Sequence, residues 1–500
     1  MVAGDGRSTN RKELSRRGFV RAVGGGAVGM GVLVTGFDNA ARAWATDTAS
    51  GHCFDHVPPL DGRLLLGSGD LTPFEDDFGH IVHQVPGAVL EPGSVRDIAA
   101  MIEFCGARRI PVAPRGQGHQ TFGQAQVSGG LVIDMGPLNS IAVDPVARTA
   151  TVGAGALWSA LLAASLAHGL TPPVFTDYIE LSIGGTLSAG GMGGTSQHFG
   201  AQVDNVIELE VVTGSGETVA CSGSRHADLF HAALAGLGQV GVITRATLPL
   251  IAAPAHARQY TLTYPSVAAL AAAQRKVVRD GRFDWLEGAA NAVTGGGWQF
   301  VLEGTAYYDG TPPDDQALIG DLGFEGAPQI QDVTYSDFVD DLAPAVAFLK
   351  STGEWHDPHP WLNIFLPDAT ADAYITAVMQ DLTLADIGAS GVVLFYPVPT
   401  GKLRAPLLRR PDSELTFLFA VLRTAAPDTE ALPAATMLEA NRVLYLKAQA
   451  LGGTQYPVGS IPMTDRDWRI QYADAWQFFS AAKHRYDPHG ILAPGQGIFD

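Results

Sequence analysis

The sequence predicts an α+β protein built from two domains. Its 500 residues exceed what a single hydrophobic core usually holds. From residue 85 onward, short apolar runs alternate with helical patterns and hairpin signals. Beyond residues 249–254, which contain two prolines, the composition changes to alanine-rich helices separated by strands. That second pattern is typical of an antiparallel sheet with helices on one side.

Residues 1–45 are expected to form a twin-arginine (Tat) signal peptide and not part of the fold. Arg16 and Arg17 precede an apolar, glycine-rich run over residues 22–37, and Ala43 and Ala45 supply small residues around a cleavage point. The run is too short and too rich in glycine to span a bilayer. We therefore expect export through the Tat machinery to an extracellular or periplasmic location.

The first domain is expected over residues 46–250. Ser94 precedes a helix whose apolar positions 95, 98, 99 and 102 share one face. Short strands at 110–113 and 131–135 enclose a glycine turn, and a second helix over 156–168 ends at Gly169. Hairpins are expected for 141–152 and 206–220.

The second domain is expected over residues 251–454, with residues 455–500 returning to complete the first. The pattern predicts helices over 266–279, 337–349 and 369–382, and strands that include 298–307 and 392–396.

Two glycine-rich segments stand out. Arg115-Gly116-Gln117-Gly118-His119 places a histidine in a tight turn whose glycines allow a bulky ligand to approach the backbone closely. Residues 184–194 hold six glycines in eleven positions, flanked by apolar segments. Taken alone, the first can be a turn with a solvated histidine and the second a flexible linker; the apolar flanks favour a loop that contacts a ligand.

Eight segments, in order, resemble the cytokinin dehydrogenases, members of the vanillyl-alcohol-oxidase (PCMH-type) group of FAD flavoproteins. They are residues 118–125, 175–188, 238–246, 283–288, 359–363, 395–397, 455–456 and 486–496, so the resemblance runs from about residue 86 to 499. It implies a two-domain PCMH-type FAD-binding fold of two α/β subdomains, with an antiparallel sheet and helices as the substrate-binding cap.

The resemblance also implies which residues bind FAD. His119 matches the histidine that carries FAD covalently through its 8α-methyl group. The other matching cofactor positions are Gly116, Gln117, Gly118, Gln120, Gln124, Ala125, Ser182, Ser188, Met192, Ile243, Tyr456 and Gln496. Gln120 and Ala493 stand where the family commonly has serine, which weakens individual contacts without threatening FAD binding.

Asp177 and Glu287 are the catalytic candidates. Asp177 matches the family aspartate that accepts a proton from the substrate's secondary amine while hydride leaves the adjacent carbon for the flavin. Glu287 matches a glutamate that binds the purine ring, and Trp361 and Tyr396 are expected to wall the pocket. Without the resemblance, the expected role of Asp177 is to cap a turn, and Glu287 is expected to be a solvent-exposed loop residue. A tryptophan usual after the matching Tyr-Pro pair is missing here, which puts the exact substrate in doubt.

The leading hypothesis is an exported FAD enzyme that oxidises N6-isoprenoid adenines to an imine, which water cleaves to adenine and an aldehyde. The alternatives are a related covalent-FAD oxidase of another amine, an alcohol or a sugar, and a flavin- or ligand-binding protein without turnover. The net charge of −19 argues against nucleic acid, and no metal site is expected. Three cysteines do not suggest a disulfide framework. The sequence does not determine the electron acceptor or the oligomeric state.

Overall fold

The computed structural model describes residues 34–38, 43–46, 57–293, 296–427 and 429–499. Arg16 and Arg17 of the expected signal peptide, and Cys53, lie outside these residues. Within the described part, β1 (Val34–Asp38) pairs antiparallel with β2 (Ala43–Thr46). No helix of the described residues is long and apolar enough to cross a membrane.

Two sheets form the first half of the molecule. A four-stranded sheet has the order β3-β4-β6-β5, and β4, β6 and β5 are parallel; α2 provides the crossover between β4 and β5. An antiparallel five-stranded sheet has the order β11-β10-β12-β8-β7. Their bounds are β3 Arg63–Leu65, β4 Ala88–Glu91, β5 Val112–Arg115, β6 Leu131–Asp134, β7 Ile141–Asp144, β8 Thr149–Gly153, β10 Glu208–Thr213, β11 Thr218–Ser222, β12 Gly241–Pro249 and α2 Val95–Arg108.

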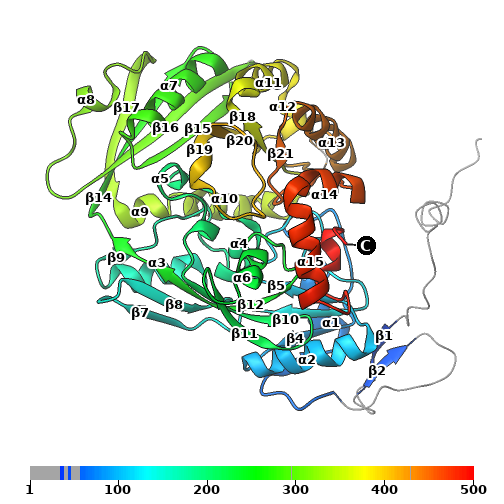
Figure 1. Cartoon of the computed structure of the whole chain (residues 1–500). Coiled ribbons are helices and arrows are strands. Elements are labelled where there is room, and N and C mark those ends of the chain that lie inside the picture. The colour runs from blue at the N-terminus through cyan, green and yellow to red at the C-terminus, as the bar shows by residue number, and fades with distance from the viewer. Residues whose placement is uncertain (1–33, 39–42, 47–56, 294–295, 428, 500) are drawn as a thin grey trace, which may run out of the picture.

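Helices from both ends of the chain pack around these sheets. They are α1 Ser68–Leu71, α3 Trp158–Leu166, α4 Ile183–Ala189, α6 Ala227–Ala233, α14 Asp465–Tyr472 and α15 Trp476–Tyr486, whereas the short α5 Ser196–Phe199 contacts β15 and β19 of the second half. The short pair β9 (Leu170–Thr171) and β13 (Ile251–Ala252) joins the middle of the chain to this half. As Figure 1 shows, α14 and α15 return from the other half of the molecule to lie beside it.

One antiparallel sheet of eight strands forms the second half. Its order is β17-β14-β16-β15-β19-β20-β18-β21. The bounds are β14 His256–Tyr264, β15 Trp285–Ala292, β16 Trp298–Tyr308, β17 Glu325–Thr334, β18 Leu362–Pro367, β19 Val392–Pro399, β20 Leu415–Leu422 and β21 Thr454–Gln455. The helices of this half are α7 Val267–Asp280, α8 Asp315–Ile319, α9 Tyr335–Val339, α10 Ala343–Thr352, α11 Asp368–Asp381, α12 Leu384–Ile387 and α13 Ala434–Ala450.

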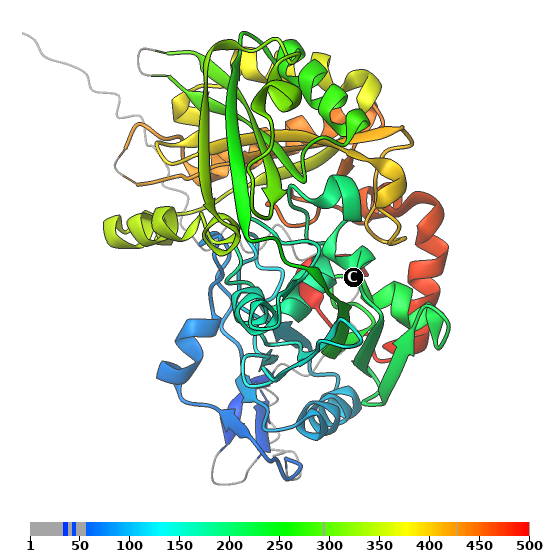
Figure 2. The same cartoon turned by 90° about the vertical axis from the view of Figure 1, so that its left-hand side faces the viewer.

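Strand periodicity divides this sheet into two faces. Alternate residues such as Phe395, Phe417 and Phe419 pack with α7, α11 and α13 in one core. Their neighbours Tyr396 and Leu418 belong to the core of the first half. The large sheet therefore has helices on its outer face and the first half of the molecule on its inner face (Figure 2). The predicted α+β fold is confirmed.

The expectation of one helix over residues 337–349 is wrong. The segment forms two helices, α9 and α10, separated by Asp340, Asp341 and Leu342. Pro344 lies in the first turn of α10. Because proline lacks an N–H and its ring clashes with the preceding turn, it suits a helix start and breaks a helix interior.

Residues 184–194 are also not wholly a loop, because their first part belongs to α4. Ile183 and Leu187 of this helix are fully buried and stabilise it despite its two glycines. The loop begins at Gly190, whose φ of 148° and that of 77° at Gly191 lie outside the helical range.

Candidate active site

A cavity of about 310 Å³ lies between the glycine turn of the first half and the inner face of the large sheet. The glycine turn follows β5 directly, so a strand of a buried sheet fixes its position. The C-terminal segment lies alongside: Val112 N–H donates to Ile491 O at 2.8 Å, and Ala493 N–H donates to Val112 O at 2.8 Å. Residues from both ends of the chain thus meet at this cavity.

The glycine turn presents backbone donors that nothing in the described protein uses. The N–H groups of Gln117, Gly118, His119 and Gln120 find no acceptor among the described residues. Gly118 has φ 65°, which glycine adopts without strain. A Cβ on Gly116 would come within 1.9 Å of Ser182 Oγ. The turn therefore combines a row of free donors with close backbone packing, an arrangement suited to an anion.

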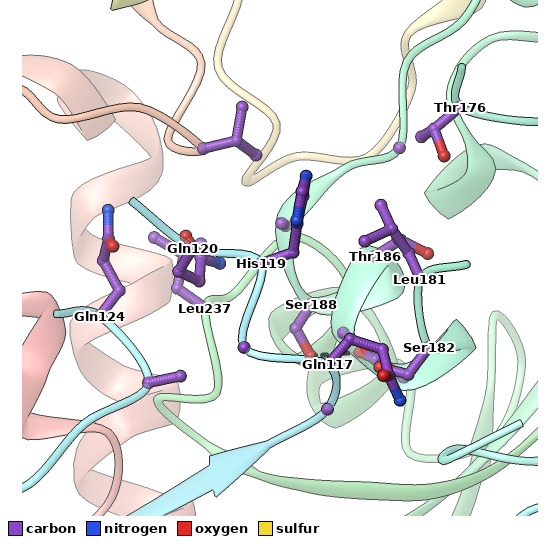
Figure 3. A pocket seen from close by; sticks show the side chains of 18 of the residues that line it. Gln117, His119, Gln120, Gln124, Thr176, Leu181, Ser182, Thr186, Ser188 and Leu237 are labelled. Atoms are coloured by element: carbon purple, nitrogen blue, oxygen red, sulfur yellow. Dashed lines mark hydrogen bonds between the residues drawn. The ribbon is translucent and has the colours of Figure 1, made fainter. Parts of the chain in front are cut away.

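His119 points away from this turn into the cavity (Figure 3). Its ring stacks on Phe78 with 4.1 Å between ring centroids and lies 5.0 Å from the ring of Tyr178 and 5.8 Å from that of Trp355. Burial among these rings lowers the pKa of His119 to about 3, helped by the nearby His359 and Lys350. The imidazole is therefore neutral at physiological pH and keeps a lone pair on one ring nitrogen.

The second glycine segment closes the cavity from another side. Tyr456 Oη accepts hydrogen bonds from Gly191 N–H at 3.0 Å and Met192 N–H at 3.3 Å. A Cβ on Gly193 would come within 1.9 Å of the carbonyl oxygen of Phe175. The loop that carries Asp177 thus packs directly on this segment, which fixes where Asp177 lies.

The structure brings together every predicted cofactor residue. His119, Gly116, Gln117, Gly118, Gln120, Gln124, Ala125, Ser182, Ser188, Met192, Ile243, Tyr456 and Gln496 all line the cavity, as do Trp361 and Tyr396. Gln124 has a further role, because its Nε2 donates to Gly459 O at 3.0 Å and so joins the glycine turn to the C-terminal segment.

These residues fit FAD. The row of free N–H groups suits the pyrophosphate, and the neutral His119 stands where a flavin ring can enter from the cavity. Gln120 Oε1 is buried without a hydrogen-bond partner, as expected for an atom whose partner is a ligand. Among the described residues, no group of three or more His, Cys, Asp or Glu side chains is arranged to hold a metal ion.

The opposite wall of the cavity is the inner face of the large sheet. Successive inward residues of β20 are Leu418, Ala420 and Leu422, and β19 adds Leu394 beside Tyr396. Asn363 of β18 also lines the cavity, and its Nδ2 is buried without a partner. Sequence reasoning missed Leu394, Leu418, Ala420 and Leu422, whose strands show little polar alternation. No site role is predicted for Asn363, although it lies in the resembling segment 359–363.

Asp177 and Glu287 form a carboxyl pair at this end of the cavity. Asp177 lines the cavity and is exposed, whereas Glu287 of β15 is outside the cavity lining and is 3% exposed. Burial raises the pKa of Asp177, and a hydrogen bond with Glu287 partly offsets the rise. Burial and the charge of Asp177 raise the pKa of Glu287 well above its usual range. Both pKa values are raised, that of Glu287 the more, so a proton shared by the pair is favoured on Glu287 and a charge on Asp177.

Two family models match the chain. One, described as an FAD binding domain, matches residues 86–222. The other, described as "Cytokinin dehydrogenase 1, FAD and cytokinin binding", matches residues 289–499. Together they cover the glycine turn and most of the large sheet.

Curated relatives extend over most of the chain. The "Uncharacterized oxidoreductase ORF5 in fasciation locus" of Rhodococcoides fascians is 40% identical over 429 residues, covering 85% of this chain and 96% of that protein. Cytokinin dehydrogenase 5 of Oryza sativa subsp. japonica is 34% identical, covering 88% and 91%. Cytokinin dehydrogenase 2 of Arabidopsis thaliana is 31% identical, covering 91% and 97%.

A solved structure supports the fold. The 6-hydroxy-D-nicotine oxidase of Arthrobacter nicotinovorans superposes with a TM-score of 0.67, covering 87% of this chain and 97% of that one. At 20% sequence identity the likeness concerns the fold alone.

Proposed function

The chain belongs to the cytokinin dehydrogenase family of FAD-dependent oxidoreductases, and on that premise we propose that it oxidises N6-isoprenoid adenines. The reaction removes a hydride from the carbon next to the secondary amine and a proton from its nitrogen. The product is an imine, which water cleaves to adenine and an aldehyde. The observation that carries the proposal is the carboxyl pair of the cavity-lining Asp177 and the buried Glu287 beside an apolar sheet face.

Bound FAD supplies the hydride acceptor, and the chain's own residues handle the proton. Asp177 is the ionised member of the pair and lines the cavity, so it is the base that accepts the amine proton. Its raised pKa makes it more basic than an ordinary aspartate. Leu394, Leu418, Ala420 and Leu422 offer the isoprenoid chain an apolar surface and exclude water.

His119 is the proposed point of covalent FAD attachment. Its low pKa leaves the imidazole neutral, and only the neutral ring has the lone pair that bond formation needs. Phe78 and Trp355 hold the ring in place by stacking. A covalent bond would prevent loss of the cofactor outside the cell, where FAD cannot be replaced.

Export and domain roles are parts of the same proposal. Residues 1–45 would direct the protein through the Tat route, which carries folded proteins and suits a flavoprotein loaded with its cofactor. Residues 46–250 and 455–500 would bind FAD, and residues 251–454 would form the substrate cap.

The test is to mix the purified holoenzyme with isopentenyladenine without oxygen and follow the visible flavin absorbance. Rapid bleaching is the expected result, since it reports hydride transfer to the flavin. An oxidised flavin after prolonged mixing would refute the cytokinin assignment, and amines, alcohols and sugars would be tested next. The negative control is an analogue of isopentenyladenine whose amine nitrogen carries no hydrogen, which should leave the flavin oxidised.

A further inference from the structure

Four carboxyl groups lie near one another at the end of the cavity that Asp177 lines, although the proposed reaction uses only Asp177 and Glu287. The third, Glu303, lies on β16 directly opposite Glu287 on β15. Directly opposed residues of an antiparallel pair point to the same face with about 4.5–5.5 Å between their Cβ atoms. The fourth, Asp341, lies in the turn between α9 and α10, next to the cavity-lining Leu342.

Glu287 and Glu303 both belong to the inner face of the sheet. Their neighbours Leu286 and Leu302 pack in the core on the outer face, and side chains alternate along each strand. Trp285 and Tyr307, two and four residues away on the same face, pack against the first half of the molecule. The two glutamates are therefore turned toward the site and toward each other.

No cation in the described part of the chain compensates this pair. Among the described residues, no lysine or arginine forms an ion pair with Glu287, Glu303, Asp177 or Asp341. Glu287 Oε1 is buried without a hydrogen-bond partner. Like charges directly opposite each other on neighbouring strands destabilise a sheet, so one member of such a pair takes up a proton.

The relative burial decides which member takes it. Glu287 is 3% exposed, whereas Glu303 is half-buried and Asp341 is exposed. Ionisation is least favourable for the most buried group, because it has the least access to water. The proton therefore goes to Glu287, and the charge stays on Glu303.

We propose that Glu303 is a positioning residue that keeps the proton on Glu287, so that Glu287 donates a hydrogen bond to Asp177 and Asp177 stays the ionised base. The role of Asp177 in this statement depends on the proposed function; the location of the proton on Glu287 does not. Glu303 acts through charge alone, from the strand next to Glu287, without touching the substrate.

Other titratable groups face Glu287 from the elements packed around it. Asp177 approaches from the loop before α4, Asp341 from the turn between α9 and α10, and Tyr396 from β19. Partial desolvation raises the pKa of Asp341 to about 6 although the residue keeps some exposure, and Asp177 and Asp340 add to the rise. Burial also raises the pKa of Glu303, with Asp341 and Asp177 contributing. Each nearby carboxylate acts in the same direction, against ionisation of Glu287.

The test is an infrared pH titration of the holoenzyme without substrate, following the C=O stretch of a protonated carboxylic acid. The Glu287→Gln variant identifies the band. In the wild type we expect the Glu287 band to persist at pH 7. In Glu303→Gln its titration midpoint should fall by about one pH unit or more, a tenfold or larger loss of proton affinity, because the charge directly opposite on the neighbouring strand is removed.

Two variants complete the design. Glu303→Asp keeps the charge and should restore most of the wild-type midpoint, whereas a merely structural role would not depend on charge. Glu325→Gln removes an exposed charge on β17 of the same sheet and should leave the midpoint unchanged. Two results would overturn the proposal. One is an ionised Glu287 in the wild type at pH 7, which needs no Glu303 variant to observe. The other is an unshifted midpoint in Glu303→Gln. Failure of the cytokinin assignment would show instead as an unbleached flavin, with the titration unaffected.

Discussion

The two walls of the cavity are built in different ways. The wall that fits FAD is mostly backbone: a row of free N–H groups in the glycine turn and a second segment held by Tyr456 Oη. The wall that faces the substrate is made of side chains, apolar ones from β19 and β20 and a carboxyl pair. The wall that fits FAD therefore depends on glycine at fixed positions. The wall proposed to face the substrate can change its selectivity through the exchange of single side chains.

The largest effect is expected for His119→Ala, which probes the cofactor wall. On acid precipitation we expect the wild type to keep its flavin in the pellet and this variant to release all of it into the supernatant, because the nitrogen proposed to attach the flavin is gone. Absorbance of pellet and supernatant measures it. His80→Ala, a nearby histidine outside the cavity lining, is the control and should keep its flavin in the pellet. Flavin that remains in the His119→Ala pellet would show that another residue forms the bond.

Asp177→Asn should have the next largest effect and probes the substrate wall. The amide cannot accept the amine proton, so flavin reduction by isopentenyladenine should slow by about 10²-fold or more. The flavin spectrum and content should stay as in the wild type, since the change lies outside the glycine turn. Anaerobic stopped-flow absorbance measures the rate, with the exposed Glu180→Gln as the control. An unchanged rate would remove Asp177 from the mechanism.

The pH dependence of the same rate follows from the raised pKa of Asp177. Asp177 acts as a base only when ionised, so the rate should fall as the pH drops through its pKa. Because that pKa is raised, the fall should begin at a higher pH than an ordinary aspartate would give. A rate that stays constant down to the range of a free aspartate would contradict this assignment.

The cofactor wall could be predicted from the sequence because the family resemblance assigns its residues and because the signal of its glycine turn is local. The glycines, His119 and the residues just after it are close in sequence, and their chemistry depends on backbone freedom that only glycine supplies. The family membership and the use of FAD are confirmed by the comparisons with known proteins. The low pKa of His119 could not be foreseen, because it depends on rings such as Trp355 from distant segments.

Most residues of the wall proposed to face the substrate could not be predicted from the sequence, for a physical reason. β20 reads Leu-Thr-Phe-Leu-Phe-Ala-Val-Leu, and a strand buried on both faces lacks the polar alternation that would show which residues face a cavity. The opposition of Glu287 and Glu303 depends on the register of β15 and β16, and a slip by one residue would turn one of them to the other face. Neither the register nor the break before α10 can be read from local composition.

Gly191→Ala tests the claim that backbone conformation, and not side-chain chemistry, supports the cofactor wall. Gly191 has φ 77°, and a Cβ there would lie 2.2 Å from Gln202 Oε1 and 2.7 Å from Gln202 Cβ. Strain and steric overlap together should lower the free energy of unfolding by about 2–4 kcal/mol. Gly169→Ala is the matched control, because it has φ 67° and open space around the added Cβ, so only the conformational strain of about 1 kcal/mol applies. Thermal unfolding of the two holoenzymes measures the difference, and equal losses would show that packing against Gln202 is unimportant.

Ala420→Val should give the smallest effect and sharpens the comparison from the substrate side. Ala420 lines the cavity between Leu418 and Leu422, so two added methyl groups narrow the apolar surface proposed for the isoprenoid chain. Valine suits a strand, and the flavin content should not change. We expect kcat/KM for isopentenyladenine to fall about tenfold, the usual scale for one or two methyl groups in an apolar pocket. A substrate with a shorter N6-alkyl group should lose less, because it does not reach the narrowed part. Equal losses for both substrates would mean that Ala420 does not contact the side chain, and the apolar face of β20 would then have to serve the flavin ring or the purine instead.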